Sequence, residues 1–512
     1  MRMKKLYQKC MKFALEHEWI VIILFIAFLL RIPNVFEPYW YGDEAIYLTI
    51  GQAMRKGIAL YSEIIDHKTP LIYVLAMVTY TQFWFKLFFI FWGMLSLSLF
   101  ASILRRLRVS SFITGLTTFF VMLLTTLPSF EGNIGNGELF VAGFVLIGLR
   151  IFIETQFFQS LAEQKPPKYT KTDRKLLFLS GFFFGLGMLT KVPALFDAVA
   201  VGWIFLNALL FSFSRKNVFS VLMQGIWFGF GVIFPIAVSI LYFLGVGSGS
   251  DYYSFGLAYN FRYSGEFGFP FEHSLLVFLY SMKGKLLILS LIGAFSLLYK
   301  KSISFLYRFG FVWTSLAFFA SMLSSRPYPH YLLQVMFPLL FLLGISLSLR
   351  KVIAHLLSGG LGISMIATLF LFHFGLYPTV SYYQRFFRYA FGTISVEEYR
   401  SQFNPLMQDT YHVANFLQEK TVATDRIFVW GTNPMLYALS QRSPADRFTV
   451  SFHIKDFDAF SSTLENIQKH KPTYIIVMNE EQDSFEELRA HISLHYTLLE
   501  SLQYMKVYRY VQ

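Results

Sequence analysis

The chain has 512 residues, of which 55% are hydrophobic and only 15% are charged. A soluble domain carries about 25% charged residues, so this composition excludes a soluble globular enzyme, and it equally excludes a disordered or collagen-like chain. The net charge of +13 does not indicate nucleic-acid binding, because the basic residues form short clusters beside long apolar blocks. We therefore expect a polytopic α-helical membrane protein.

The N-terminal segment is predicted to be the first membrane span. A basic start precedes an apolar run from Trp19 to Leu30, and no small-residue cleavage site follows that run. We expect this span to stay uncleaved, with the N-terminus in the cytoplasm.

Eleven further apolar stretches follow the first. They lie near residues 70–83, 86–104, 111–127, 138–155, 176–193, 197–213, 225–245, 285–299, 304–322, 331–349 and 353–376. The basic clusters at 105–108, 165–175, 215–216, 300–301 and 350–351 mark the expected cytoplasmic loops. Residue 70 should then be outside and Arg105 inside, although two apolar stretches separate them. Either 70–83 is a short re-entrant helix or one crossing is missing, which gives 11 or 13 spans and an external C-terminus.

The first external loop, 33–69, contains the most unusual residues of the chain. Asp43 and Glu44 lie just outside a span, among aromatic residues that suit the membrane interface. On a helix, adjacent side chains point about 100° apart, so one carboxylate can face a cleft while the other bonds to the scaffold. A partly desolvated carboxylate at this place suits a general base; the alternative is an interfacial loop with ordinary capping acids.

Several cations are candidates for binding a phosphate or a sugar at the outer side. Lys68 lies where the chain returns to the membrane, and it either binds a lipid phosphate or snorkels to the interface. Lys191 ends an apolar helix on the outer side. Arg326, His330 and Tyr331 belong to a short proline-rich turn that is dense in hydrogen-bond donors.

The remaining acidic and histidine residues carry weaker signals. Asp66 in the first loop, and Glu131 and Glu138 around the external loop 128–137, are candidates for an acceptor site or a second acidic site. The glycines between Glu131 and Glu138 lack the spacing of a phosphate-binding loop and favour a flexible turn. His67, His330 and His373 show no metal-ligand spacing, so neither a metal nor a cofactor is predicted, and a divalent metal is left open.

The segment 378–512 is predicted to be a separate soluble domain on the outer side. It holds 13 Lys and Arg against 15 Asp and Glu, so the positive excess lies in 1–377. Strands are expected at 426–430, 473–478, 495–499 and 504–509, and helices at 404–420, from Asn433-Pro434, at 458–470 and at 483–492. This alternation predicts a small α/β layer domain.

The motifs, taken in chain order, resemble those of the membrane glycosyltransferases that use polyprenyl-phosphate sugars. This GT-C fold group includes protein O-mannosyltransferases, the aminoarabinose transferase of lipid A and lipopolysaccharide-core sugar transferases. The resemblance covers most of 1–350 and rests on an ordered set of short motifs. They are Asp43-Glu44, Lys68-Thr69-Pro70-Leu71, Gly185-Leu186-Gly187, Leu189-Thr190-Lys191, Pro329-His330-Tyr331 and Pro338.

The resemblance implies transfer of a hexosyl or pentosyl group from a polyprenyl-phosphate donor to a lipid, glycan or protein acceptor. The reaction would take place on the outer face of the cell membrane (the inner or plasma membrane), with inversion at the anomeric carbon. Asp43 would be the general base, and Lys68, Lys191 and Arg326 would bind the donor phosphate. Thr69 replaces a proline that the family often has, and 128–140 lacks the Asp that relatives often place there.

Two other functions compete with this interpretation. A flippase or transporter for lipid-linked sugars would favour ionisable or Gly/Pro-broken sites near the bilayer midplane, whereas the distinctive charges here lie at the outer edge. An O-antigen ligase or polymerase would be expected to have several Arg in a long external loop, and 246–284 has only Arg262.

Overall fold

The computed structural model describes residues 18–168, 170–210, 215–260, 272–298, 303–324, 326–349 and 351–511. The chain forms two compact units. Unit 1 consists of Met1–Ile32, Phe89–Ser239 and Phe261–Thr379, and unit 2 consists of Pro33–Phe88, Ile240–Asn260 and Val380–Gln512. The C-terminal residues thus share a unit with the loop 33–69 and with a segment that begins in the last turns of the helix ending at Gly245.

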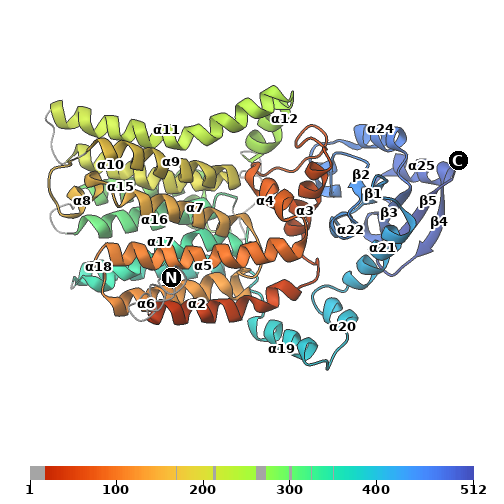
Figure 1. Ribbon diagram of the computed structural model, residues 1–512, viewed down its shortest axis with the longest axis horizontal. Coiled ribbons are helices and arrows are strands. Elements are labelled where there is room, and N and C mark those ends of the chain that lie inside the picture. Colours follow the sequence, from red (N-terminus) through yellow and green to blue (C-terminus); the bar gives the residue numbers. More distant parts are fainter. Residues whose placement is uncertain are drawn as a thin grey trace, which may run out of the picture. The chain divides into compact units, whose positions relative to one another are not determined.

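Unit 1 is a bundle of apolar helices (Figure 1). Its helices are α2 (Glu18–Arg31), most of α5 (Gln82–Arg106), α6 (Ser111–Thr126), α7 (Gly137–Phe152), α8 (Gln156–Ala162), α9 (Lys171–Thr190), α10 (Leu195–Leu209), most of α11 (Arg215–Gly245), α14 (Ser274–Tyr280), α15 (Met282–Leu298), α16 (Phe305–Ser321), α17 (Leu333–Ser348) and α18 (Val352–Leu371). Helix α7 packs against α9 and α17, and α16 packs against α10 and α17. A Cβ added to Gly185 of α9 would lie 2.4 Å from the Val232 carbonyl oxygen, so this glycine lets α9 and α11 approach closely.

The helices confirm a multi-pass membrane protein. Among the described residues, six helices are long and apolar enough to cross a membrane, or seven if the pair α14 and α15, bent by 66°, is one span. A shorter apolar helix, α6, has 16 residues, and α7, α9 and α16 have 16 to 20 residues. The number of 11 or 13 spans stays a prediction.

The helix expected at 70–83 is short. Helix α4 (Leu71–Thr79) has 9 residues, about 14 Å at 1.5 Å per residue, whereas a bilayer core is about 30 Å thick. Of the two alternatives for this stretch, this length favours the short re-entrant helix over a crossing. Of the basic residues used to orient the chain, those of the N-terminal segment 1–17 and Lys300, Lys301 and Arg350 lie outside the described residues.

The orientation of the chain is a testable prediction, since it rests on the loop charges alone. Cys10 is the only cysteine, so a Cys10→Ser background allows single cysteines to be placed at will. In intact cells, we expect Ser462→Cys to react with a membrane-impermeant maleimide, and Gln164→Cys to react only after permeabilisation. Both positions are exposed. The reverse labelling pattern would overturn the predicted orientation.

Unit 2 combines short helices with a sheet. The helices that precede the sheet in the chain are η1 (Ile32–Phe36), α3 (Gly42–Arg55), α4, α12 (Gly249–Asp251), η4 (Tyr252–Ala258), α19 (Thr379–Ala390) and α20 (Val396–Ser401). The elements that follow are α21 (Met407–Lys420), β1 (Arg426–Trp430), α22 (Met435–Ser440), β2 (Ser443–Pro444), α23 (Ser451–Asp456), α24 (Phe460–His470), β3 (Tyr474–Met478), α25 (Glu486–His495), β4 (Tyr496–Ser501) and β5 (Met505–Tyr510).

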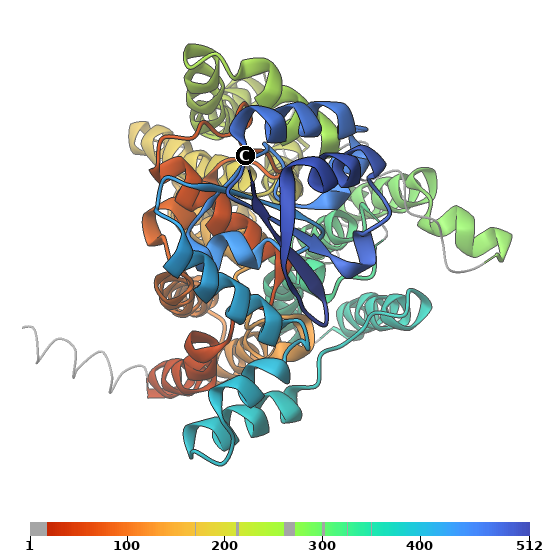
Figure 2. The same cartoon turned by 90° about the vertical axis from the view of Figure 1, so that its right-hand side faces the viewer.

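The sheet confirms the small α/β domain (Figure 2). Its strand order is β2-β1-β3-β5-β4; β1 runs parallel to β2 and β3, and β5 runs antiparallel to β3 and β4. Phe428 and Trp430 face the core shared with α24 and α25, whereas Ile427 and Val429 face the core shared with α21 and α22. The side chains alternate between two buried faces, which explains the continuous apolar run in β1. Elements β2 and α23, with 2 and 6 residues, were too short to predict.

The first loop is attached to the α/β domain by specific contacts. The Thr49 hydroxyl and the Gln52 amide donate hydrogen bonds to the carbonyl oxygens of Pro434 (3.2 Å) and Ala438 (3.1 Å). Ile65 belongs to the same apolar core as Trp430, and its N–H donates to the Arg447 carbonyl oxygen at 2.8 Å. These contacts therefore fix the backbone at Ile65, from which the residues that follow it continue.

Candidate active site

Asp43 and Glu44 lie in the first turn of α3, where acidic side chains favour the positive end of the helix dipole. Their side chains diverge, as the helical geometry predicts. The Asp43 side chain is 30% exposed, and its Oδ1 lies 3.4 Å from the Nζ of Lys68. The Glu44 side chain is only 2% exposed, and its Oε1 lies 2.9 Å from the Nζ of Lys86.

Lys86 binds two buried carboxylates. Its Nζ, fully buried, lies 3.0 Å from Glu37 Oε2 as well as 2.9 Å from Glu44 Oε1. The Tyr382 hydroxyl donates to the other oxygen of Glu37. This cluster ties the start of α3 to the first turns of α5 and makes a scaffold role for Glu44 more favourable than a catalytic one. Sequence reasoning missed Lys86, although a lysine inside an apolar run is a recognisable signal of a buried partner.

Lys68 contacts both the partly exposed Asp43 and a buried acid. Its Nζ lies 3.4 Å from Asp43 Oδ1, 3.4 Å from Asp66 Oδ2 and 5.1 Å from the centroid of the Tyr47 ring. The backbone of Lys68 is also held, since its carbonyl oxygen accepts from the Tyr61 hydroxyl at 2.7 Å. These contacts therefore hold the Lys68 ammonium in place, and it does not extend freely into solvent.

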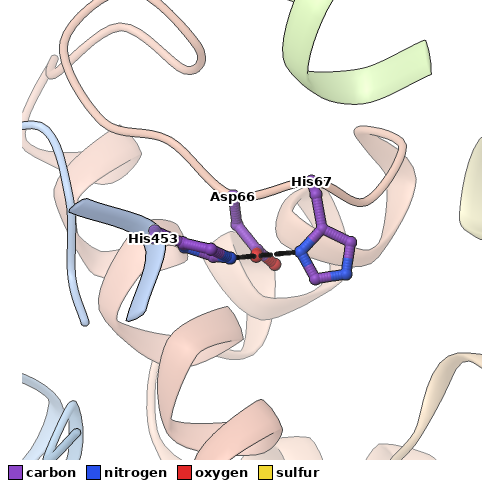
Figure 3. Close-up of side chains that lie close together, drawn as sticks. All are labelled: Asp66, His67 and His453. Carbon is purple, nitrogen blue, oxygen red and sulfur yellow. Dashed lines mark hydrogen bonds and ion pairs between the residues drawn. The ribbon is translucent and has the colours of Figure 1, made fainter. Parts of the chain in front are cut away.

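The Asp66 side chain is fully buried, and it also contacts His67 and His453 (Figure 3). Its Oδ2 accepts a hydrogen bond from the Tyr73 hydroxyl at 2.6 Å. Its Oδ1 lies 3.0 Å from His67 Nδ1 and 3.5 Å from His453 Nε2. Burial would raise the pKa of the Asp66 carboxyl, but the Lys68 ammonium and the His67 imidazole outweigh it and hold the pKa well below its usual value. Burial lowers the pKa of His453 to about 3, so this imidazole is neutral near pH 7.

In unit 1, the structure brings together other residues predicted from the sequence. Lys191, at the end of α9, forms an ion pair with Glu138 in the first turn of α7, and its Nζ lies 4.6 Å from the centroid of the Tyr331 ring. His330 Nδ1 lies 2.6 Å from Glu131 Oε2. Both acids are buried, and so is every residue from 131 to 138. The glycines of this loop predicted a flexible turn, whereas the structure shows a packed loop.

The predicted site residues therefore fall into distinct groups. Asp43, Lys68 and Asp66 form one cluster in unit 2, and Glu44 belongs to a neighbouring cluster of the same unit. Lys191, Glu138 and Tyr331, and separately His330 and Glu131, are paired in unit 1, where Arg326 lies half-buried in the turn before η5 (Pro329–Leu332). His453 and Tyr73 were missed, because only the folded chain brings them to Asp66.

The chain, with its bundle of apolar helices and its small α/β domain, is a multi-pass membrane protein of the GT-C fold. Over 97% of its length, the chain is similar in structure to the protein described as "Crystal Structure of ArnT from Cupriavidus metallidurans bound to Undecaprenyl phosphate", with a TM-score of 0.57, 14% sequence identity and 98% of that chain covered. This similarity confirms the predicted fold class and the resemblance to the GT-C group. Residues 407–510, which run from α21 to β5, match the family model described as "Putative competence-induced protein Ccs4 C-terminal domain". Comparison with curated proteins gave no match.

Proposed function

We propose that this protein transfers a sugar from a polyprenyl-phosphate donor to a hydroxyl group of a lipid, glycan or protein acceptor on the outer face of the cell membrane. The observation that carries the proposal is the pair formed by Asp43, a partly exposed carboxylate, and Lys68, a held ammonium 3.4 Å away. The fold supports it, because the similar ArnT structure is bound to undecaprenyl phosphate.

Asp43 is the best candidate for the general base. A base must come within hydrogen-bond reach of the hydroxyl whose proton it takes. Asp43 is 30% exposed, whereas the side chains of Glu44 and Asp66 are 2% and 0% exposed. An acceptor arriving from water can therefore reach Asp43, while the other two acids are occupied by buried partners.

The proposed reaction is a single displacement at the anomeric carbon. The acceptor oxygen forms a bond to that carbon while the bond from the carbon to the phosphate oxygen breaks. The phosphate leaves with the bonding electrons, and Asp43 takes the proton of the acceptor hydroxyl. Lys68 would stabilise the charge that develops on the leaving phosphate. Because contacts hold the Lys68 side chain in place, it would need little rearrangement during the reaction.

Lys191 is the second candidate for binding the donor phosphate. Its side chain is 19% exposed and lies against the ring of Tyr331. A lysine at the end of an apolar helix suits the headgroup level of a bilayer, where the phosphate of a prenyl lipid lies. Its ion pair with Glu138 keeps the ammonium in place.

Replacement of either lysine should weaken the use of the donor. A charge-assisted hydrogen bond contributes about 1.5–3 kcal/mol, so we expect Lys68→Ala and Lys191→Ala each to lower kcat/KM for the donor by about tenfold to hundredfold. The measurement is sugar transfer by purified protein in detergent at varied donor concentration. Lys420→Ala, at an exposed position of α21, is the control. Wild-type kinetics in the double variant would show that neither lysine binds the phosphate.

The proposed function itself can be tested with one purified preparation. The protein is incubated with a synthetic polyprenyl-phosphate sugar labelled in the sugar, together with membranes from a strain that lacks the gene. We expect the label to appear in a glycolipid or glycoprotein and the free polyprenyl phosphate to accumulate. If reconstituted protein instead moves the intact donor across vesicles without cleaving it, the protein is a transporter of lipid-linked sugars.

A further inference from the structure

We propose that Asp66, His67 and His453 form a binding site for a divalent transition-metal ion, with Zn²⁺ as the best match. Three potential ligand atoms converge there, namely Asp66 Oδ1, His67 Nδ1 and His453 Nε2 (Figure 3). Their separations are 3.0 Å (Oδ1 to His67), 3.5 Å (Oδ1 to His453) and 3.2 Å between the two ring nitrogens. Two imidazoles and one carboxylate, with a further position for water, are a common zinc ligand set.

The spacing fits an ion of this size. Zinc binds nitrogen and oxygen at about 2.0–2.1 Å, which places the ligand atoms of a tetrahedral site about 3.4 Å apart. The three observed separations lie within a few tenths of an ångström of that value. Small shifts of the side chains would therefore complete the coordination without a change in the backbone.

The chemistry of the three groups also suits a cation, because a carboxylate oxygen and imidazole nitrogens are the donor atoms that zinc binds. The Asp66 side chain is fully buried, and His453 is 1% exposed. The His67 side chain is 15% exposed, so the site is open to solvent on that side.

Neighbouring groups orient the ligands, as expected around a metal centre. The Tyr73 hydroxyl binds Asp66 Oδ2, which turns Oδ1 toward the imidazoles. The Asn260 side chain donates to the His67 carbonyl oxygen at 2.9 Å. His453 lies on α23, next to the core that contains Ile65, so the backbones of the ligands are joined through one packed cluster.

A hydrogen-bonded triad is the competing arrangement. In that arrangement the His67 Nδ1–H group would donate to Asp66 Oδ1 at 3.0 Å, and the two ring nitrogens, 3.2 Å apart, would share a hydrogen bond. The two arrangements differ in whether the protein retains a metal ion, and that difference is measured directly.

The site would join parts of the chain that are far apart in sequence. His67 and His453 are 386 residues apart. An ion held by them would clamp the loop that carries Lys68 onto the α/β domain, and Asp66 would contact both the ion and the Lys68 ammonium. The proposal does not depend on glycosyl transfer, because metal binding is measured directly.

The test is the metal content of the full-length protein, purified in detergent without chelators and dialysed after incubation with ZnCl₂. We expect about one zinc per chain by elemental analysis, and visible absorption typical of tetrahedral Co²⁺ after exchange with cobalt. His67→Asn and His453→Gln place an amide near the position of each ligating nitrogen, and each should lower metal affinity by at least about tenfold. His412→Gln, an exposed histidine paired with Glu500, is the matched control.

Each outcome decides the proposal. Wild-type protein that holds no zinc or cobalt after dialysis would overturn it, and so would variants that retain as much metal as His412→Gln. Size-exclusion chromatography of every variant shows whether it is folded. If His453→Gln does not fold, His67→Asn and the cobalt spectrum of the wild-type protein still give the answer, since His67 is partly exposed.

Discussion

Asp43→Asn is expected to lower the rate of sugar transfer by about 10²- to 10⁴-fold while the protein stays folded. Asparagine keeps the size of the side chain and its ability to accept a hydrogen bond from Lys68, but it does not take up the acceptor's proton. The Asp43 side chain is 30% exposed and has Lys68 as a partner at 3.4 Å, so the change buries no new charge. The loss should therefore appear in kcat.

The measurement is the initial rate of transfer from a synthetic polyprenyl-phosphate sugar, with monodispersity checked for each variant. Asp483→Asn is the control, because the Asp483 side chain is 84% exposed and far from α3 in sequence. Glu44→Gln should reduce the rate less and the stability more, since Glu44 is buried against Lys86.

Two results would contradict this assignment. A folded Asp43→Asn protein with near wild-type turnover would remove Asp43 from the mechanism and revive the transporter hypothesis. A stable Glu44→Gln protein that loses activity more completely than Asp43→Asn would show that Glu44 is the base and that the roles of the pair are reversed.

Lys86→Met is expected to destabilise the protein by about 3–5 kcal/mol. The substitution keeps the length of the side chain but removes the cation that lies 3.0 Å from Glu37 and 2.9 Å from Glu44. Both carboxylates are almost completely buried, so they would be left without their compensating charge, or would have to take up protons.

Equilibrium unfolding in mixed detergent and SDS micelles measures the free energy of unfolding. Lys165→Met, whose side chain is 64% exposed in a surface ion pair, should change that free energy by less than about 0.5 kcal/mol. Adding Glu37→Gln and Glu44→Gln to Lys86→Met should restore part of the loss, because the buried charges are then removed together. If Lys86→Met is as stable as Lys165→Met, the cluster is not a structural anchor.

Much of the architecture could be predicted from local patterns. The apolar blocks predicted the helices of the bundle, and the boundaries of β1 at 426–430 and β3 at 474–478 were predicted to within a residue. The divergence of Asp43 and Glu44 follows from the 100° step of a helix, so it too was accessible from the sequence. These features depend on residues close together in the chain, where periodicity and turn chemistry act directly.

The composition of the clusters was decided only by the tertiary structure. Nothing local to Asp66 indicates that His453, on α23, will lie against it, and nothing local to Glu44 indicates Lys86 as its partner. The buried state of Glu131 and Glu138 likewise depends on His330 and Lys191. A buried charge is tolerated only where a distant segment supplies its counter-charge, so the partner is set by packing of the whole chain and not by its neighbours in sequence.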